Sequence, residues 1–203
     1  LYAFFSFLLS QEPELKSINA DKINFLKKLF RYSEGIALLD ASLGKKLDRE
    51  KSESEAEIKA DYISLFIAPG DKYVPPYESV YVDKDPLADR GLVMGPSTFK
   101  VKEFYAKAGL APSKDFGELP DHIGLELAFM AFLCKREACA EDKDKAGEFL
   151  KLEKAFLEQH LIKWMEEYFA LLYQKAGTGF YRAIALLAKD FIQSDFKYLA
   201  SQR

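Results

Sequence analysis

The sequence LFIAPG at residues 65–70, followed by PPYESVY at residues 75–81, interrupts a chain whose remaining pattern is helical. Five of the eight prolines lie between Pro69 and Pro96. Connections longer than about 12 to 15 residues without regular structure are uncommon in compact domains, and most are functional or disordered. Because this one is rich in tyrosine, we expect an ordered loop that holds a partner rather than reacting with it.

On the N-terminal side of this connection, apolar residues recur with the spacing of helices. A short first helix is indicated by Leu1–Leu9 and is expected to end before Pro13. A second helix of moderate length is predicted over Ile23–Leu39, and a third over Ala56–Phe66. The third should end before Pro69, because a proline disfavours helix in the residue that precedes it.

After the connection, the pattern predicts a helix over Pro96–Gly109, another that begins beside Asp121, the longest one over Phe149–Leu171, and a last one capped by Thr178. The total is about seven helices and no strand. The sequence therefore predicts an all-α fold, with residues 1–203 as a single globular helical domain that carries a long proline-rich loop.

Composition restricts the classes of partner. The 29 basic and 32 acidic residues give a net charge of −3, which excludes a basic surface for nucleic acid and suits a cationic ligand. Cys134 and Cys139 are not expected to pair, so a reducing, cytoplasmic compartment is the simplest interpretation. With two histidines in the chain we predict no metal site and no cofactor. The apolar run Leu1–Leu9 is too short to cross a membrane.

Two interpretations are open for the residues around Asp121. Asp121 is a good N-cap, which would place His122 in the first turn of a helix with a purely structural role. Alternatively, His122 and Glu126 share one helical face, where the carboxylate would raise the pKa of the imidazole and prepare an acid–base pair. His160 and Trp164 are interpreted as core residues of the longest helix.

The tyrosines of the connection also allow two interpretations. Tyr73, Tyr77 and Tyr81 alternate with apolar residues, and Glu78 and Asp83 lie beside them. Rigid prolines and flat rings form a preformed apolar surface, and the neighbouring carboxylates favour cations. A peptide with arginines next to an apolar segment matches such a surface. Otherwise the loop packs on its own domain and closes a core.

Several segments resemble the TorD/DmsD family of redox-enzyme maturation chaperones. The first signature is DYISLF at 61–66, APG at 68–70 and PPYESVY at 75–81, and the second is PDHI at 120–123 with Glu126. FLEQHL at 156–161 with Trp164, and GFYRA at 179–183, are similar to the C-terminal helices of the family in order and spacing. The resemblance covers essentially the whole chain.

The resemblance implies a cytoplasmic, all-helical, non-enzymatic chaperone for a molybdenum-cofactor oxidoreductase that is exported by the twin-arginine route. Such a chaperone binds the twin-arginine leader and the folding body of its client, aids cofactor insertion and delays export until maturation. No residue selects among the possible clients. By this resemblance, the leader-binding positions are Leu65, Phe66, Pro75, Pro76, Tyr77, Ser79, Tyr81, Asp121, His122 and Glu126.

Within this set, the resemblance implies two kinds of contact with a leader. Asp121 and neighbouring carboxylates would bind its cationic part, while Leu65, Phe66, Tyr77 and Tyr81 would bind its apolar part. His122 would orient hydrogen bonds, and its protonation near neutral pH would weaken binding of a cation. Some relatives carry tryptophan at the position of Tyr77. The family also forms dimers that exchange helices, for which residues 110–119 are the candidate hinge.

Two other functions are alternatives to that of a leader-binding chaperone. One is a nucleotide-hydrolysing enzyme that uses Glu126 and His122. The other is a helical adaptor that binds a folded partner without recognising a leader.

Overall fold

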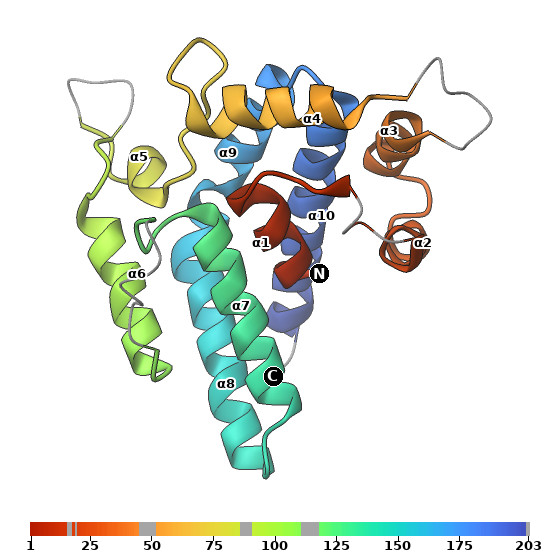
Figure 1. Ribbon diagram of the computed structural model, residues 1–203. Coiled ribbons are helices and arrows are strands. Elements are labelled where there is room, and N and C mark those ends of the chain that lie inside the picture. Colours follow the sequence, from red (N-terminus) through yellow and green to blue (C-terminus); the bar gives the residue numbers. More distant parts are fainter. Residues whose placement is uncertain (16–17, 19, 45–51, 86–90, 111–117, 202–203) are drawn as a thin grey trace. The chain divides into compact units, whose positions relative to one another are not determined.

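The computed structural model in Figure 1 describes residues 1–15, 18, 20–44, 52–85, 91–110 and 118–201. These residues form helices α1 (Tyr2–Ser10), α2 (Ala20–Leu29), α3 (Glu34–Leu43), α4 (Glu55–Tyr62), α5 (Glu78–Val82), α6 (Pro96–Lys107), α7 (Ile123–Ala138), α8 (Lys143–Phe156), α9 (Ile162–Lys175) and α10 (Gly179–Ser201), with π-helical turns η2 (Ile63–Ile67) and η3 (Leu157–Leu161). Within the described part of the chain there is no strand, and isolated bridges are the nearest approach to one. The all-α prediction is confirmed.

The described residues contain ten α-helices rather than the seven expected, for three physical reasons, one of which is that η3 separates α8 from α9. The predicted helix over Ile23–Leu39 is wrong, because the Ser33 side chain accepts a hydrogen bond from the Ile36 amide and starts α3 as a separate helix. The proline-rich connection is likewise not one continuous loop, since Glu78–Val82 forms α5. The proposed hinge at 110–119 lies largely outside the described residues.

The longest predicted helix is a composite in the structure. Helix α8 begins at Lys143, where Asp142 caps it, and η3 then leads without a break into α9. The π-helical turn carries one residue more per hydrogen-bonded ring than an α-helix does. It therefore changes the direction in which the residues after Phe156 project.

The described chain divides into two compact units. The first comprises residues 1–10, 76–166 and 192–203, and the second comprises residues 11–75 and 167–191. In the first unit, α1 packs on α7, and α7 lies antiparallel beside α8 (Figure 1). Gly124 allows the α1 contact, because a Cβ atom there would lie 1.7 Å from Ser10 Oγ.

The core of the first unit is aromatic. Phe156 lies at its centre, with its ring 4.8 Å from that of Phe129 and 5.5 Å from that of Phe104. Tyr105 approaches Phe129 at 4.6 Å. Edge-on and tilted pairs of this kind stabilise a core beyond the area that they bury. This packing fixes α6, α7 and α8 against one another, and the site described below uses α6 and the start of α7.

In the second unit, a buried carboxylate closes the start of α10. Asp61, which is 5% exposed, accepts hydrogen bonds from the Gly177 amide at 3.0 Å, the Thr178 amide at 2.8 Å and Thr178 Oγ1 at 2.7 Å. Thr178 in turn caps α10, as predicted, through a bond from the Tyr181 amide. The start of α10 thus depends on Asp61, which lies more than a hundred residues earlier in the sequence.

No helix among the described residues combines the length and apolar character needed to cross a bilayer. Cys134 and Cys139 are both free thiols, as expected.

Replacing Asp61 with Ala should lower the free energy of unfolding by about 3 kcal/mol, because three donors lose their acceptor in a buried place. Asp142→Ala is the matched control, since Asp142 is an exposed N-cap that accepts one backbone hydrogen bond, from the Lys145 amide, and its loss should cost about 1 kcal/mol. Urea unfolding of both variants makes the comparison. Equal losses in the two would contradict the role assigned to Asp61.

Candidate functional site

The two signature segments of the first unit pair through their backbones. Tyr77 and His122 form an antiparallel bridge. The Glu78 amide donates to the Asp121 carbonyl at 2.9 Å, and the Ile123 amide donates to the Pro76 carbonyl at 2.8 Å. We call the paired residues 76–81 and 121–123 the latch. It joins the start of α5 to the start of α7, although some forty residues separate them in the sequence.

The side chain of Asp121 reinforces the latch. It is fully buried, and its Oδ2 accepts a hydrogen bond from the Ser79 amide at 3.0 Å. The prediction that Asp121 caps α7 is therefore wrong. His122 is the N-cap instead, because its Nδ1 accepts a hydrogen bond from the Gly124 amide at 3.0 Å. Asp121 caps the first turn of the opposite helix, α5.

His122 is neutral in this environment. Burial lowers its pKa to about 4, against the opposing influence of the carboxylates of Glu118 and Asp121. An Nδ1 that accepts a hydrogen bond leaves the proton of the neutral ring on Nε2. The expected titration near neutral pH and the expected rise in pKa beside Glu126 are both wrong. Desolvation of the ring outweighs the neighbouring charges.

Tyr77 forms the partly exposed edge of the latch. Its ring meets that of His122 edge-on, with 5.4 Å between centroids. Its hydroxyl donates to Oε2 of the exposed Glu118 at 2.7 Å. An aromatic ring and a solvent-accessible carboxylate are thus held together at the surface of the first unit.

A second buried carboxylate of the latch has a histidine partner. Glu78 is 1% exposed and His160 is 2% exposed, and Oε2 of the former lies 2.8 Å from Nδ1 of the latter. His160 belongs to η3, so the π-helical turn delivers its ring to this carboxylate. The ring also contacts Phe104 and Phe156. The interpretation of His160 as a core residue is confirmed.

The third buried carboxylate is Glu126. It is fully buried, and its Oε2 accepts a hydrogen bond from Trp164 Nε1 at 3.2 Å. Burial, and then the nearby charge of Glu78, raises the pKa of Glu126 well above its usual range. Trp164 also stacks on Tyr81, with 5.4 Å between ring centroids, and is a core residue as predicted.

Tyr105 of α6 supports the latch from a third element. Its hydroxyl donates to the Pro120 carbonyl at 2.7 Å, directly before Asp121. Burial, followed by the charges of Glu126, Asp121 and Glu78, raises the pKa of this phenol well above its usual value. It therefore stays protonated and remains a donor.

The ten positions proposed for leader binding differ in exposure. Partly exposed side chains are found at Pro75 and Tyr77, and the buried set comprises Leu65, Phe66, Pro76, Ser79, Tyr81, Asp121, His122 and Glu126. The structure brings together those from position 76 onward, all in the first unit. Leu65 and Phe66 belong to the core of the second unit, where the Phe66 ring packs on Tyr181 at 5.5 Å.

Five residues that complete this site were not among the proposed positions: Glu78, Tyr105, Glu118, His160 and Trp164. A sequence signal existed for two of them, because the four-residue spacing of His160 and Trp164 puts both on one helical side. Glu78 lies inside the first signature. Nothing local marked Tyr105 or Glu118, whose partners are distant in sequence.

The arrangement has the chemistry of a support rather than of a reactive centre. His122 and Glu126 do not form an acid–base pair, since they bond to Gly124 and Trp164 respectively. Among the described residues, no group of three His, Cys, Asp or Glu side chains is placed to hold a metal ion. The part of the site that a partner can reach is the edge formed by Tyr77 and Glu118.

Comparison with known proteins gives a consistent result. The family described as nitrate reductase delta subunit matches residues 31–170. The chaperone protein TorD of Aliivibrio fischeri is 25% identical over 96% of this chain and 79% of its own length. TorD of Vibrio cholerae is 29% identical over 72% of this chain and 64% of its own length. These relatives bear the names of chaperones, not of enzymes.

A solved structure is also similar. It is a putative redox enzyme maturation protein from Archaeoglobus fulgidus, with 21% identity, coverage of 99% of this chain and 94% of the other, and a TM-score of 0.45.

Replacing Glu126 with Gln should stabilise the protein increasingly as pH rises. The raised pKa means that the folded state prefers protonated Glu126, so wild type loses up to about 1.4 kcal/mol per pH unit above about pH 4.5, until the folded state ionises as well. A neutral amide retains an acceptor for Trp164 and has no such loss. Urea unfolding from about pH 5 to about pH 8 measures the difference between the two proteins. A difference independent of pH would contradict a protonated Glu126.

Proposed function

Since this chain belongs to the nitrate reductase delta subunit family of TorD-like maturation chaperones, we propose that it binds the twin-arginine leader of a molybdenum-cofactor oxidoreductase. The chaperone also binds the body of this client, aids insertion of the cofactor and delays export until maturation is complete. It acts in the cytoplasm, before the client is exported. Family membership and the names of the relatives support the proposal.

The observation that supports leader binding most directly is the pair formed by Tyr77 and Glu118. A leader joins a guanidinium group to an apolar segment, and a carboxylate beside an aromatic face is complementary to both parts. The hydroxyl of Tyr77 already occupies one oxygen of Glu118, at 2.7 Å. A planar guanidinium is able to replace that neutral donor with two charged ones.

The buried positions have a different role in this proposal. Ser79 and Asp121 hold the latch, and the latch sets the position of Tyr77. Glu126 bonds to Trp164, whose ring stacks on Tyr81 of the latch. Pro75 and Pro76 restrict the backbone ahead of it. We predict that Asp121→Ala reduces leader affinity by more than it reduces stability. Because Asp121 is fully buried, stability is the first quantity to measure in that variant.

The rival hydrolase lacks support in the geometry. Glu126 has no access to solvent, and burial lowers the pKa of His122 to about 4, so neither is prepared as a general base at neutral pH. The adaptor that binds a folded partner without a leader stays an alternative, and it predicts no dependence on arginines in the ligand. No described residue selects the client.

Glu118→Gln should weaken binding of a twin-arginine leader peptide about fivefold to tenfold, because a charge-assisted hydrogen bond becomes a neutral one. A leader in which lysines replace both arginines should bind wild type more weakly and lose less on the same substitution. Calorimetric titration of the purified chain with both peptides measures these affinities.

Glu103→Gln is the matched control, since Glu103 is an exposed carboxylate on α6 of the same unit. Equal leader affinity in Glu118→Gln, Glu103→Gln and wild type would remove Glu118 from the site. Equal affinity for the arginine and lysine leaders would favour the adaptor instead.

A further inference from the structure

Helix α2 of the second unit carries a concentration of positive charge in a chain whose net charge is negative. Residues 20–32 contain four basic side chains and one acidic side chain, Asp21, in a protein of net charge −3. Leu26 alone among the large apolar residues of this helix is completely buried. Three of the basic residues therefore lie on a helix that exposes most of its circumference to solvent, and Arg31 lies in the turn after it.

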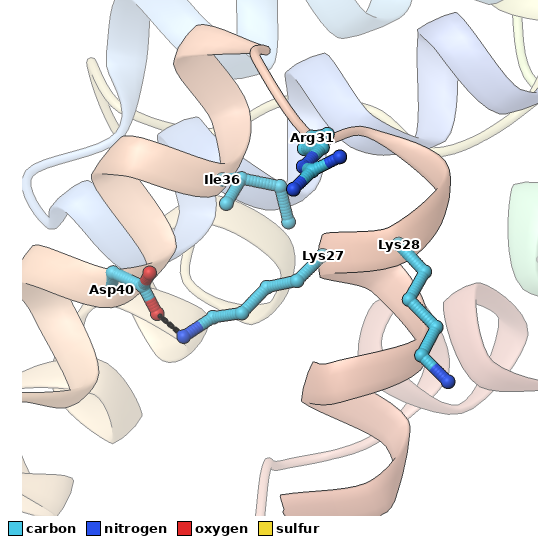
Figure 2. Close-up of a pocket in the computed structure, with 5 residues that line it drawn as sticks. All are labelled: Lys27, Lys28, Arg31, Ile36 and Asp40. Carbon is cyan, nitrogen blue, oxygen red and sulfur yellow. Dashed lines mark ion pairs between the residues drawn. The ribbon is translucent and has the colours of Figure 1, made fainter.

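Three of the basic side chains line one hollow of about 560 Å³: Lys27, Lys28 and Arg31. Figure 2 shows Lys27 reaching from α2 to Asp40 of α3, while Arg31 lies near Ile36 and Lys28 leaves the helix in another direction. Lys27 Nζ and Asp40 Oδ1 lie 2.6 Å apart in an ion pair, so the positive charge of Lys27 already has an acidic partner. Within the described residues, neither Lys28 nor Arg31 has an acidic partner.

A second hollow, of about 590 Å³, adjoins the first and shares Lys28 with it. Its other lining residues are Asp21, Asn24 and Phe25. The residues that line the two hollows begin at Asp21 in the first turn of α2 and extend past its end to Arg31, and α2 itself is about 15 Å long. An extended peptide of four or five residues has that length.

Large apolar side chains are exposed beside these cations. Phe25 is 52% exposed, Leu29 is 53% exposed and Tyr32 is 92% exposed. Phe25, Lys28 and Leu29 are spaced three and four apart, which groups them on one side of α2, and Tyr32 lies in the turn that follows the helix. The guanidinium of Arg31 lies 5.8 Å from the Tyr32 ring. The surface is therefore cationic and apolar at once, and we call residues 24–32 with Ile36 the α2 surface.

We propose that the α2 surface binds a polypeptide segment in which carboxylates alternate with apolar side chains. The carboxylates pair with Lys28 and Arg31, and the apolar side chains cover Phe25, Leu29 and Tyr32. A small anion would use the cations and leave the apolar side chains uncovered. A twin-arginine leader has the wrong charge, so this surface serves a different segment, and its function does not depend on leader binding.

Fluorescence anisotropy of the full chain with a labelled peptide tests the proposal. The peptide has about seven residues in which Glu alternates with Leu and Phe, and its control carries Gln in place of every Glu. We expect the acidic peptide to bind with an affinity that falls as salt rises, and the Gln peptide to bind far more weakly. The double substitution Lys28→Gln and Arg31→Gln should reduce affinity about tenfold.

Lys100→Gln with Lys102→Gln is the matched control, because it removes the same charge from exposed positions of α6 in the other unit. This variant should bind within about twofold of wild type. Unaltered circular dichroism in both double variants shows that any loss is not unfolding.

Four results would overturn the proposal: no binding of the acidic peptide up to about 1 mM, equal affinity in the two double variants, release of the peptide by millimolar inorganic phosphate, or sedimentation with phosphatidylglycerol vesicles in place of peptide binding. The third would identify a small-anion site and the fourth a lipid-binding surface. Loss of leader binding in Glu118→Gln leaves all of these measurements unaffected.

Discussion

Three carboxylates, Glu78, Asp121 and Glu126, lie buried within one small region, and the first unit is organised around the bonds that one oxygen of each makes to a distant partner. An isolated buried carboxylate is far too costly to persist, so each must be hydrogen-bonded, paired or neutral. Asp121 accepts a hydrogen bond from the Ser79 amide, and Glu78 lies against His160. Glu126 is bonded to Trp164, and its raised pKa favours the neutral, protonated carboxyl. These bonds join α5 to the segment just before α7, η3 to α5, and α9 to α7.

Because of this requirement, the signature residues that support the fold differ from those that are exposed to a ligand. Most of the ionisable side chains in the signature segments are buried and form their bonds within the fold. The accessible edge that remains consists of Tyr77 and Glu118. Most members of the signature therefore hold the backbone, and few are placed where a ligand could reach them. Because Asp121 and Glu126 are fully buried, their substitution is expected to alter stability, so stability and leader affinity both have to be measured for each variant.

Much of the fold was predictable from the sequence because helical periodicity and caps act over a few residues. The Pro13 and Pro69 boundaries, the Thr178 cap and the burial of His160 and Trp164 all followed from local pattern. The division of α2 from α3 was missed, since the Ser33 cap competes with an uninterrupted apolar period. The latch was beyond local reasoning, because Asp121 serves Ser79 rather than its own helix. The partial exposure of Tyr77 and its bond to Glu118 depend on contacts of the same long-range kind.

Hydrogen–deuterium exchange with and without a leader peptide is the sharpest test of the proposed binding of a twin-arginine leader at the edge of the latch. In the free protein, the amides of Glu78, Ser79 and Ile123 are protected by the bonds that form the latch. Bound leader should slow amide exchange in peptides covering residues 76–82 and 118–126 and leave the exchange rates of α2 unchanged. Slowed exchange confined to other segments, with residues 76–82 and 118–126 unaffected at saturating leader, would contradict the proposal.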